Sequence, residues 1–366
     1  MAKATITFKP KQTTKKLLKG LQDRAQEVIV NRFGLGDEGE HYTLESIGQK
    51  YGITRERVRQ IENFALNAIK KSDSFTEAEE IFKELKDVIH SLGGVVAEDE
   101  LLPMLSKDPV TQNHIGLYLT LGDEFKEAKE DNNFKKRWVV DTATADKVHK
   151  ALLDIHSALS HEDLISKNEI LDRVMCHQGI CEITTHKVDA EMAERWLNLS
   201  KSLAKNPLGE WGKSTSPNVK TRGIKDYAYL VMRRHGSPMH FREVAEAIEK
   251  TFGKKTHTAT THNELIKDAR FVLVGRGVYA LKEWGYKGGV VREVIEDILK
   301  KEGPMSKDDI VEKVLKERYL KKNTILVNLM NPKNFKKKSV TDILEGKKYT
   351  PLFALDGYCM MIVSTL

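Results

Sequence analysis

The sequence predicts a mainly α-helical fold, in which an N-terminal helix-turn-helix is followed by tandem winged-helix units with small β-hairpin wings. One observation is that the pattern of residues 43–71 predicts two helices separated by Gly52. Another is an internal repeat, because the Pro-Met pairs at 238–239 and 304–305 lie 66 residues apart. Each repeat also ends in two apolar runs around a glycine, which is typical of a hairpin.

Composition sets the broad class of protein. The 366 residues are 40% hydrophobic and 31% charged, so the chain has enough apolar residues to form hydrophobic cores. At about 100–200 residues per domain, its length predicts several domains. No apolar run has the length of a membrane helix, and the N-terminal stretch lacks the apolar core of a signal peptide. Three cysteines are too few for a disulfide framework. We therefore expect a cytoplasmic protein with no membrane contact.

Charge is distributed unevenly along the chain, whose net charge is +7. Residues 1–72 hold 14 Lys and Arg against 8 Asp and Glu, whereas residues 73–142 hold 8 against 16. Residues 222–289 are basic again, with 13 against 7. Because nucleic-acid affinity comes largely from neutralising phosphates, any such contact is expected from the two basic ends. Chance variation of surface charge is the alternative explanation.

Residues 43–71 contain the signals of a helix-turn-helix. Thr43 is placed to cap a first helix with the sequence LESIGQKY, and Gly52 ends that helix. Ile53 is expected to pack inward, and Thr54 to cap the second helix. Two helices joined by a short turn that contains glycine are the pattern of a helix-turn-helix.

The second of these helices has a core side and an outer side. At about 100° per residue, Val58, Ile61 and Ala65 fall on one face. The outer face combines guanidinium, carboxylate and amide groups, the side chains that read base edges in the major groove. A solvated helix surface is the alternative. The candidate DNA-binding residues at the start and on the outer face of this helix are Thr54, Arg55, Glu56, Arg57, Arg59, Gln60 and Asn63.

The middle of the chain is interpreted as two further winged-helix-like units, the acidic residues 73–142 and residues 143–216. In the first unit we expect a helix over 76–92 with a capping box of Thr76 and Glu79, then a helix at about 98–105. The segment FKKRWVVD is a candidate wing strand.

In the second unit, Ser166 and Glu169 form a predicted capping box, and the segment WLNLSKSLAKNP is a predicted third helix. Gly209 and Gly212 mark a wing. The polar run at 214–223 is interpreted as a linker.

The rear half contains the two repeats, residues 222–289 and 290–366. In the first, the apolar runs FVLV and VYAL flank Gly275-Arg276-Gly277, which places Arg276 at a hairpin tip. In the second, Asp356-Gly357 in FALDGYCMMIV is a strong two-residue hairpin signal. The N-terminal module, residues 1–72, thus precedes four winged-helix-like units.

The residues RAQEVIVNRFGLGDEGEHYTLESIGQKYGITRERVRQIENFALNAIKK resemble region 4 of the sigma-70 family, and TRERVRQIE at 54–62 is the most specific part. The resemblance implies binding of promoter DNA at the minus-35 element and docking on the β flap of RNA polymerase. Arg55, Glu56 and Gln60 would read bases, while Arg57 and Arg59 would hold phosphates or flanking bases. The upstream regions of a sigma factor are not found, so a complete, independently acting sigma factor is not expected.

Residues 224–286 resemble the HARE-HTH winged helix, including that of the RNA polymerase delta subunit. FVLVGRGVYAL followed by KEWGY is the specific part. The acidic tail of the delta subunit has no counterpart here, because residues 290–366 are basic. If this winged helix contacts DNA, its candidate residues are Lys254, Lys255, His257, Thr258, Thr261 and Arg276.

Metal, cofactor and catalytic sites are not expected. Cys176 and Cys181 do not have zinc-knuckle spacing, although His177 and His186 lie near them. His257 and His262 lack the glutamate of a zincin motif, and no Walker sequence or nucleophile elbow is present. We therefore expect no metal, no cofactor and no enzymatic activity.

Three functional hypotheses remain open. The leading one is a DNA-binding transcription regulator that resembles sigma-70 region 4 and acts at initiation with RNA polymerase on promoter-like double-stranded DNA. The alternative is an interaction protein of RNA polymerase, delta-like or competing with sigma, for which DNA contact is secondary. The third, a specificity module in DNA restriction or modification, depends only on where HARE-HTH domains also occur.

Overall fold

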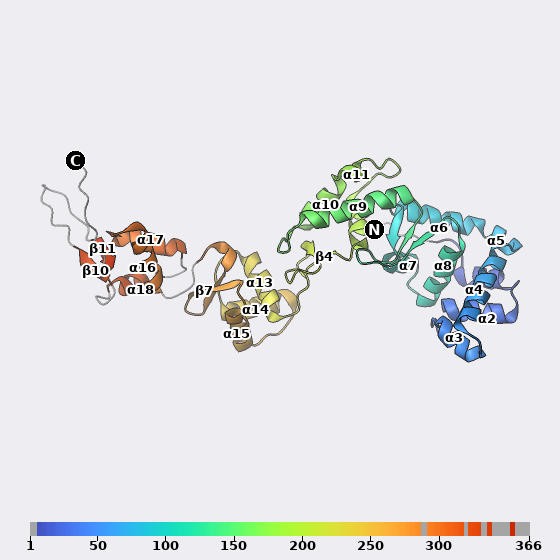
Figure 1. The fold of residues 1–366 in the computed structure, drawn as a ribbon, viewed down its shortest axis with the longest axis horizontal. Coiled ribbons are helices and arrows are strands. Elements are labelled where there is room, and N and C mark those ends of the chain that lie inside the picture. Colours follow the sequence, from blue (N-terminus) through green and yellow to red (C-terminus); the bar gives the residue numbers. More distant parts are fainter. Residues whose placement is uncertain (1–5, 287–290, 318–320, 331–334, 339–351, 356–366) are drawn as a thin grey trace. The chain divides into compact units, whose positions relative to one another are not determined.

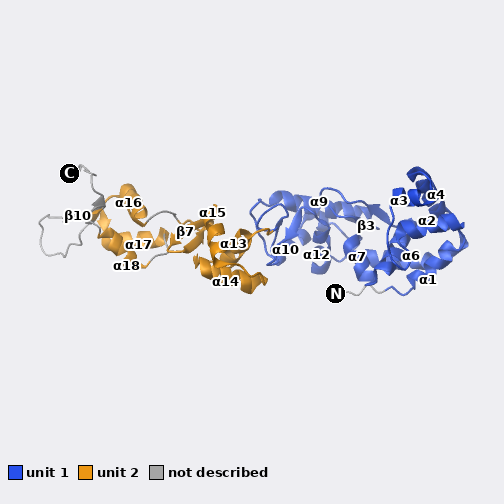
Figure 2. Ribbon diagram, turned by 90° about the horizontal axis from the view of Figure 1, so that it is seen from below, with its two compact units in different colours: residues 1–220 blue, residues 221–366 orange. Residues whose placement is uncertain are grey.

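A computed structural model describes residues 6–286, 291–317, 321–330, 335–338 and 352–355. It is mainly helical, with small antiparallel sheets, as the sequence predicts (Figure 1). The chain forms two compact units, residues 1–220 and 221–366 (Figure 2). The predicted segments 1–72, 73–142 and 143–216 lie in the first unit, and the two repeats lie in the second.

The N-terminal helices pack around a small apolar core. They are α1 (Pro10–Leu18), α2 (Asp23–Phe33), α3 (Leu44–Tyr51) and α4 (Arg55–Lys70). Val28 of α2, Ile47 of α3 and Val58 of α4 are buried against one another. This three-way contact fixes the angle between α3 and α4, because each helix contributes one apolar stripe to the same core.

The next segment adds helices and a three-stranded sheet in the order β1-β3-β2. Its elements are α5 (Asp73–Glu77), α6 (Glu79–Ser91), β1 (Val95–Ala97), α7 (Glu98–Leu105), α8 (Pro109–Leu121), β2 (Lys126–Ala128) and β3 (Arg137–Val139). The predicted helix at 98–105 and the strand within FKKRWVVD are confirmed. The capping box of Thr76 and Glu79 is wrong: Thr76 lies inside α5, which Ser72 caps, and α6 begins after Ala78 with no side-chain cap.

This segment shares one hydrophobic core with the N-terminal helices. Leu17 and Ile29 from the N-terminal helices, and Ile115 and Tyr118 from α8, belong to the same buried cluster. Helix α1 packs directly on α8, as α2 also does. The helix-turn-helix is therefore built onto α8 rather than separated from it by a linker.

The third segment contains α9 (Thr142–Ala158), α10 (Lys167–Met175), α11 (Gln178–Cys181), α12 (Ala190–Leu199), β4 (Leu203–Lys205) and β5 (Trp211–Lys213). Ser166 caps α10, as predicted. The predicted helix WLNLSKSLAKNP is wrong beyond Leu199, because the following residues form β4, which pairs with β5 through a turn at Gly209. The predicted linker at 214–223 is not an exposed connection, because Ser216, Asn218 and Val219 within it are buried.

The two repeats have the same strand topology. The first contains α13 (Ile224–His235), β6 (Met239–His240), α14 (Phe241–Phe252), α15 (Thr258–Lys267), β7 (Phe271–Gly275), β8 (Val278–Leu281) and the 3-10 helix η1 (Lys282–Trp284). The second contains α16 (Val291–Glu302), β9 (Met305–Ser306), α17 (Lys307–Glu317), α18 (Lys322–Leu329), β10 (Phe335–Lys338) and β11 (Leu352–Leu355).

The sheets run β6-β8-β7 and β9-β11-β10, and the methionine of each Pro-Met pair begins the short first strand. The predicted duplication is therefore confirmed. Asp356-Gly357 lies outside the described residues, and the strand before it, β11, pairs with β9 and β10. Within the described part of the chain, every helix is too short or too polar to cross a membrane.

Candidate nucleic-acid interface

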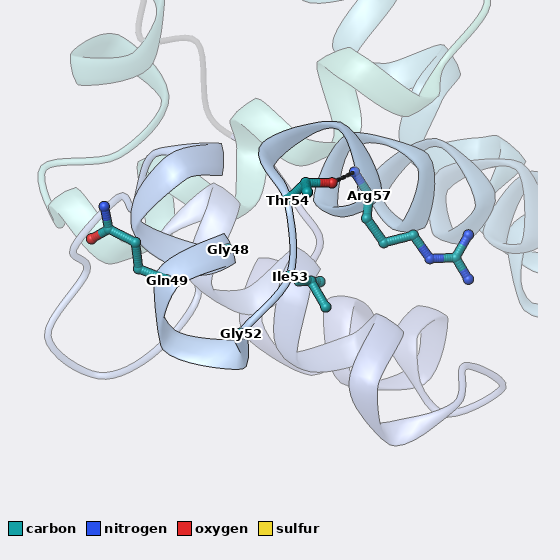
Figure 3. Close-up of a pocket in the computed structure, with 6 residues that line it drawn as sticks. All are labelled: Gly48, Gln49, Gly52, Ile53, Thr54 and Arg57. Carbon is teal, nitrogen blue, oxygen red and sulfur yellow. Dashed lines mark hydrogen bonds between the residues drawn. The ribbon is translucent and has the colours of Figure 1, made fainter.

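The turn between α3 and α4 is held by two side-chain caps. The backbone N–H of Ser46 donates to Thr43 Oγ1 over 3.1 Å, and that of Arg57 donates to Thr54 Oγ1 over 3.2 Å (Figure 3). Gly52 ends α3 with a φ of 64°, a left-handed conformation that glycine adopts without strain. Both predicted caps and the predicted break are confirmed.

Gly48 determines how closely the two helices approach. A Cβ atom at this position would lie 2.6 Å from the carbonyl oxygen of Ile53. The backbone N–H of Ile53 in turn donates to the carbonyl oxygen of Gly48 over 2.9 Å. The missing side chain of Gly48 thus lets the turn pack directly on the backbone of α3, which fixes where α4 starts.

Helix α4 has the buried and exposed sides that the sequence predicts. Val58 and Ala65 are fully buried, and Ile61 is partly buried against the same core. The seven candidate residues of this helix and its cap are all exposed. The division of the helix into an inner and an outer side is confirmed, while DNA contact by the outer side stays a prediction.

Charged and amide groups on the outer side bind one another. Arg59 donates to both carboxylate oxygens of Glu56, over 2.9 and 2.6 Å. These bonds lower the pKa of Glu56 and raise that of Arg59. Arg57 Nη1 donates to Gln60 Oε1 over 3.1 Å. The guanidinium of Arg55 has no such partner among the described residues, so its donors are available to a base or a phosphate.

A hollow lies in front of the turn, beside the start of α4. Gln49, Gly52, Thr54 and Arg57 are among the residues that line it, and Figure 3 shows the side chains of Gln49 and Arg57 extending on either side of the turn. The start of a helix favours an anion through its free N–H groups. Gln49, which the sequence did not single out, lines this hollow because it lies three residues before Gly52.

The six candidate residues of the first repeat lie in three kinds of environment. Five are exposed, of which Lys254 is also bonded to Tyr227, and Thr261 is buried. Lys255, His257 and Thr258 are exposed at the start of α15, and Arg276 is exposed at the tip between β7 and β8. The ammonium of Lys254 donates to Tyr227 Oη over 2.6 Å and lies 4.2 Å from that ring's centre. Part of its bonding capacity is therefore already used within the domain.

Thr261 is a correction to the predicted set. Its side chain is fully buried, and its hydroxyl donates to the carbonyl oxygen of His257 over 3.2 Å. A threonine hydroxyl bound back to its own helix in this way has no access to DNA. Its buried position follows from the helical spacing of Thr261 and Leu265, which places both on the core side of α15.

Cys181 and His177 have separate local partners. The thiols of Cys176 and Cys181 are free and exposed, and that of Cys181 donates to the carbonyl oxygen of Met175 over 3.3 Å. His177 Nε2 lies 3.2 Å from a carboxylate oxygen of Asp154. Over the residues that the structure describes, no three His, Cys, Asp or Glu side chains are grouped as metal ligands would be.

The fold and this surface define two segments of the chain as helix-turn-helix domains of a DNA-binding type. Residues 17–71 match the family model of sigma-70 region 4. Residues 222–284 match the model of the HARE-HTH domain, a helix-turn-helix domain named in part after restriction endonucleases. Both resemblances that the sequence predicts are confirmed, and they cover the helix-turn-helix and the first winged-helix repeat.

Proposed function

We propose that this chain is a DNA-binding transcription regulator that acts at initiation together with RNA polymerase in the cytoplasm. The observation that carries the proposal is the exposed row of Arg55, Glu56, Gln60 and Asn63 on a helix whose opposite side is anchored in the core. An α-helix of this kind fits the major groove, where each base pair presents its own donors and acceptors.

In this proposal α4 supplies sequence discrimination, and the basic side chains supply affinity that does not depend on sequence. Arg55 reads guanine, Gln60 and Asn63 read adenine, and Glu56 accepts from the amino group of cytosine. Lys255 at the start of α15 and Arg276 in the wing add a second contact to the duplex. The chain performs no covalent chemistry and needs no cofactor.

The test is selection of bound sites from random duplexes by the full chain, followed by mapping of its sites in the native genome beside RNA polymerase. We expect a recurrent motif that coincides with minus-35 positions of promoters. A motif that depends on base modification, away from promoters, would instead support a role in restriction or modification. Binding without any sequence preference would contradict base reading by α4.

A second candidate is an interaction protein of RNA polymerase, which docks through the sigma-like module on the β flap. It is favoured by the acidic segment 73–142, which shares a core with that module and so presents negative charge beside it. The two candidates differ in whether the chain prefers a particular duplex sequence. Co-purification of the full chain with RNA polymerase in the absence of DNA, retained after Arg55→Ala, supports this second function when the chain also shows no sequence preference among duplexes.

A further inference from the structure

A cavity lies between α1, α2 and α8, on the side of the N-terminal helices where α8 packs. Its volume is about 490 Å³, within the range of roughly 300–1,000 Å³ for small-molecule sites. Leu18, Val30, Leu35 and Val110 provide its apolar lining. This apolar part of the lining favours a ligand with an apolar body, because its burial releases surface water.

Lysines of α1 surround this apolar lining. Lys11, Lys15 and Lys19 follow one another at intervals of four residues and all line the cavity. Lys11 is paired with Asp108 at 3.0 Å. Lys15 and Lys19 have no hydrogen-bond or ion-pair partner among the described residues. One lining residue, Asp37, is acidic, so the lining carries a net positive charge that suits an anion.

His114 adds a buried polar group to the cavity wall. It is 5% exposed, and its Nδ1 lies 2.9 Å from Thr14 Oγ1. Thr14 Oγ1 lies 2.8 Å from Tyr118 Oη, which donates to the carbonyl oxygen of Pro10. Because the single hydroxyl hydrogen of Tyr118 is used there, Thr14 donates to Tyr118 and the Nδ1–H of His114 donates to Thr14.

This bonding order determines what His114 offers to a ligand. With its hydrogen on Nδ1, the neutral ring presents the lone pair of Nε2, which has no partner among the described residues. A lone pair without a protein partner can accept a hydrogen bond from a ligand that brings a hydroxyl donor. Desolvation by burial lowers the pKa of His114, which keeps the ring neutral.

We propose that this cavity is a binding site for an organic anion that has an apolar body and a hydroxyl donor. The apolar walls take that body, Lys15 and Lys19 attract the anionic group, and His114 Nε2 accepts from the hydroxyl. The cavity borders α2, which packs on both α3 and α4. A bound ligand therefore links α1 and α8 to the helix that supports the helix-turn-helix.

The test is calorimetric titration of the full chain, without DNA, using hydroxynaphthoate as the probe. Naphthoate, which lacks the hydroxyl, and naphthol, which lacks the carboxylate, are titrated beside it. We expect hydroxynaphthoate to bind and each of the other two to bind at least about fivefold more weakly, because each loses one polar contact. Naphthol binding as tightly as hydroxynaphthoate, or no binding of hydroxynaphthoate at millimolar concentration, would overturn the proposal.

A matched pair of double variants assigns the binding to this cavity. Lys15→Gln with Lys19→Gln removes the two unpaired lining charges, whereas Lys9→Gln with Lys16→Gln removes two charges of the same region that do not line the cavity. We expect the first pair to weaken hydroxynaphthoate about fivefold and the second to leave it unchanged. Equal weakening by both pairs contradicts the assignment. Because no DNA is present, this result is independent of whether α4 binds a promoter.

Discussion

Arg59 and Glu56 form a two-point ion pair on the exposed side of α4, with Arg59 Nε and Nη2 donating to the two carboxylate oxygens of Glu56. The two residues are three apart, so both belong to the surface that the helix turns away from its core. In the free protein each of these charges is therefore partly neutralised by the other. In the proposed complex with DNA, this pair would be exchanged for contacts to bases and phosphates.

Replacing Glu56 should change how this surface binds DNA. In Glu56→Gln, Arg59 loses its partner and one negative charge leaves the surface, so affinity for a scrambled duplex should rise about two- to tenfold. Discrimination at the base pair that Glu56 reads should fall. Fluorescence anisotropy titrations at several salt concentrations measure both effects. Glu80→Gln, the same change of charge on α6, is the control, and an equal rise in that variant would contradict a local role.

Loss of a base-reading side chain should cost affinity only on the preferred sequence. Arg55→Ala and Gln60→Ala should each weaken binding of the selected site by about 1–3 kcal/mol and relax specificity at one base pair. Asn67→Ala, an exposed change nearer the end of the same helix, should have little effect. Competition between selected and scrambled duplexes is the measurement. Variants that bind both duplexes like the parent chain would rule out base reading by these residues.

Much of this site could be predicted because local rules and tertiary packing agree there. Thr43, Gly52 and Thr54 act through contacts within three residues of the chain, so their roles follow from the sequence. The burial of Thr261 could also have been predicted, because it lies four residues before Leu265 and therefore on the same core side of its helix. The pairing of Arg59 with Glu56 depends on side-chain rotamers, which a helical wheel does not specify.

Long-range packing explains why some parts of the fold could not be predicted from the sequence. The residues after Leu199 have an acceptable helical pattern, but Leu203 and Lys205 instead form a strand against β5, and strand pairing overrides local propensity. The cavity beside α1 could not be predicted, because its walls come from segments about 90 residues apart. Val219 is buried in a run that has a linker's composition, since it packs beside Gly212.

The close approach at Gly48 gives a stability prediction with a matched control. Gly48→Ala gains roughly 1 kcal/mol of helix propensity. The new methyl group must, however, displace the carbonyl oxygen of Ile53, and overpacking of this kind costs about 1–3 kcal/mol. Gly116→Ala, in the interior of α8, gains the same propensity and meets no atom within 4 Å. Denaturant unfolding should therefore show Gly116→Ala as the more stable variant by about 1–3 kcal/mol. Equal stability of the two would contradict the packing at the turn.

The pH dependence of stability should follow the half-buried ring of His149. Its Nε2 accepts from Arg137 Nε over 2.8 Å, and burial, together with that guanidinium, lowers its pKa from 6.5 to about 4. The unfolded chain therefore takes up a proton below pH 6.5 that the folded chain takes up only near pH 4. The contribution of this histidine is complete above pH 6.5 and is lost as the pH falls towards 4.

Thermal unfolding at two pH values tests this contribution. Between about pH 7 and about pH 5, His149 should account for about 1 kcal/mol, once water screening at its partly exposed ring is allowed for. Such a loss lowers the unfolding temperature by roughly 2–4 °C. His149→Gln keeps an acceptor for Arg137 but does not titrate, so its unfolding temperature should depend less on pH. His161→Gln, whose ring is exposed, is the control. If the unfolding temperature of His149→Gln depends on pH as that of the parent chain does, the pKa of His149 in the folded chain is not lowered from 6.5.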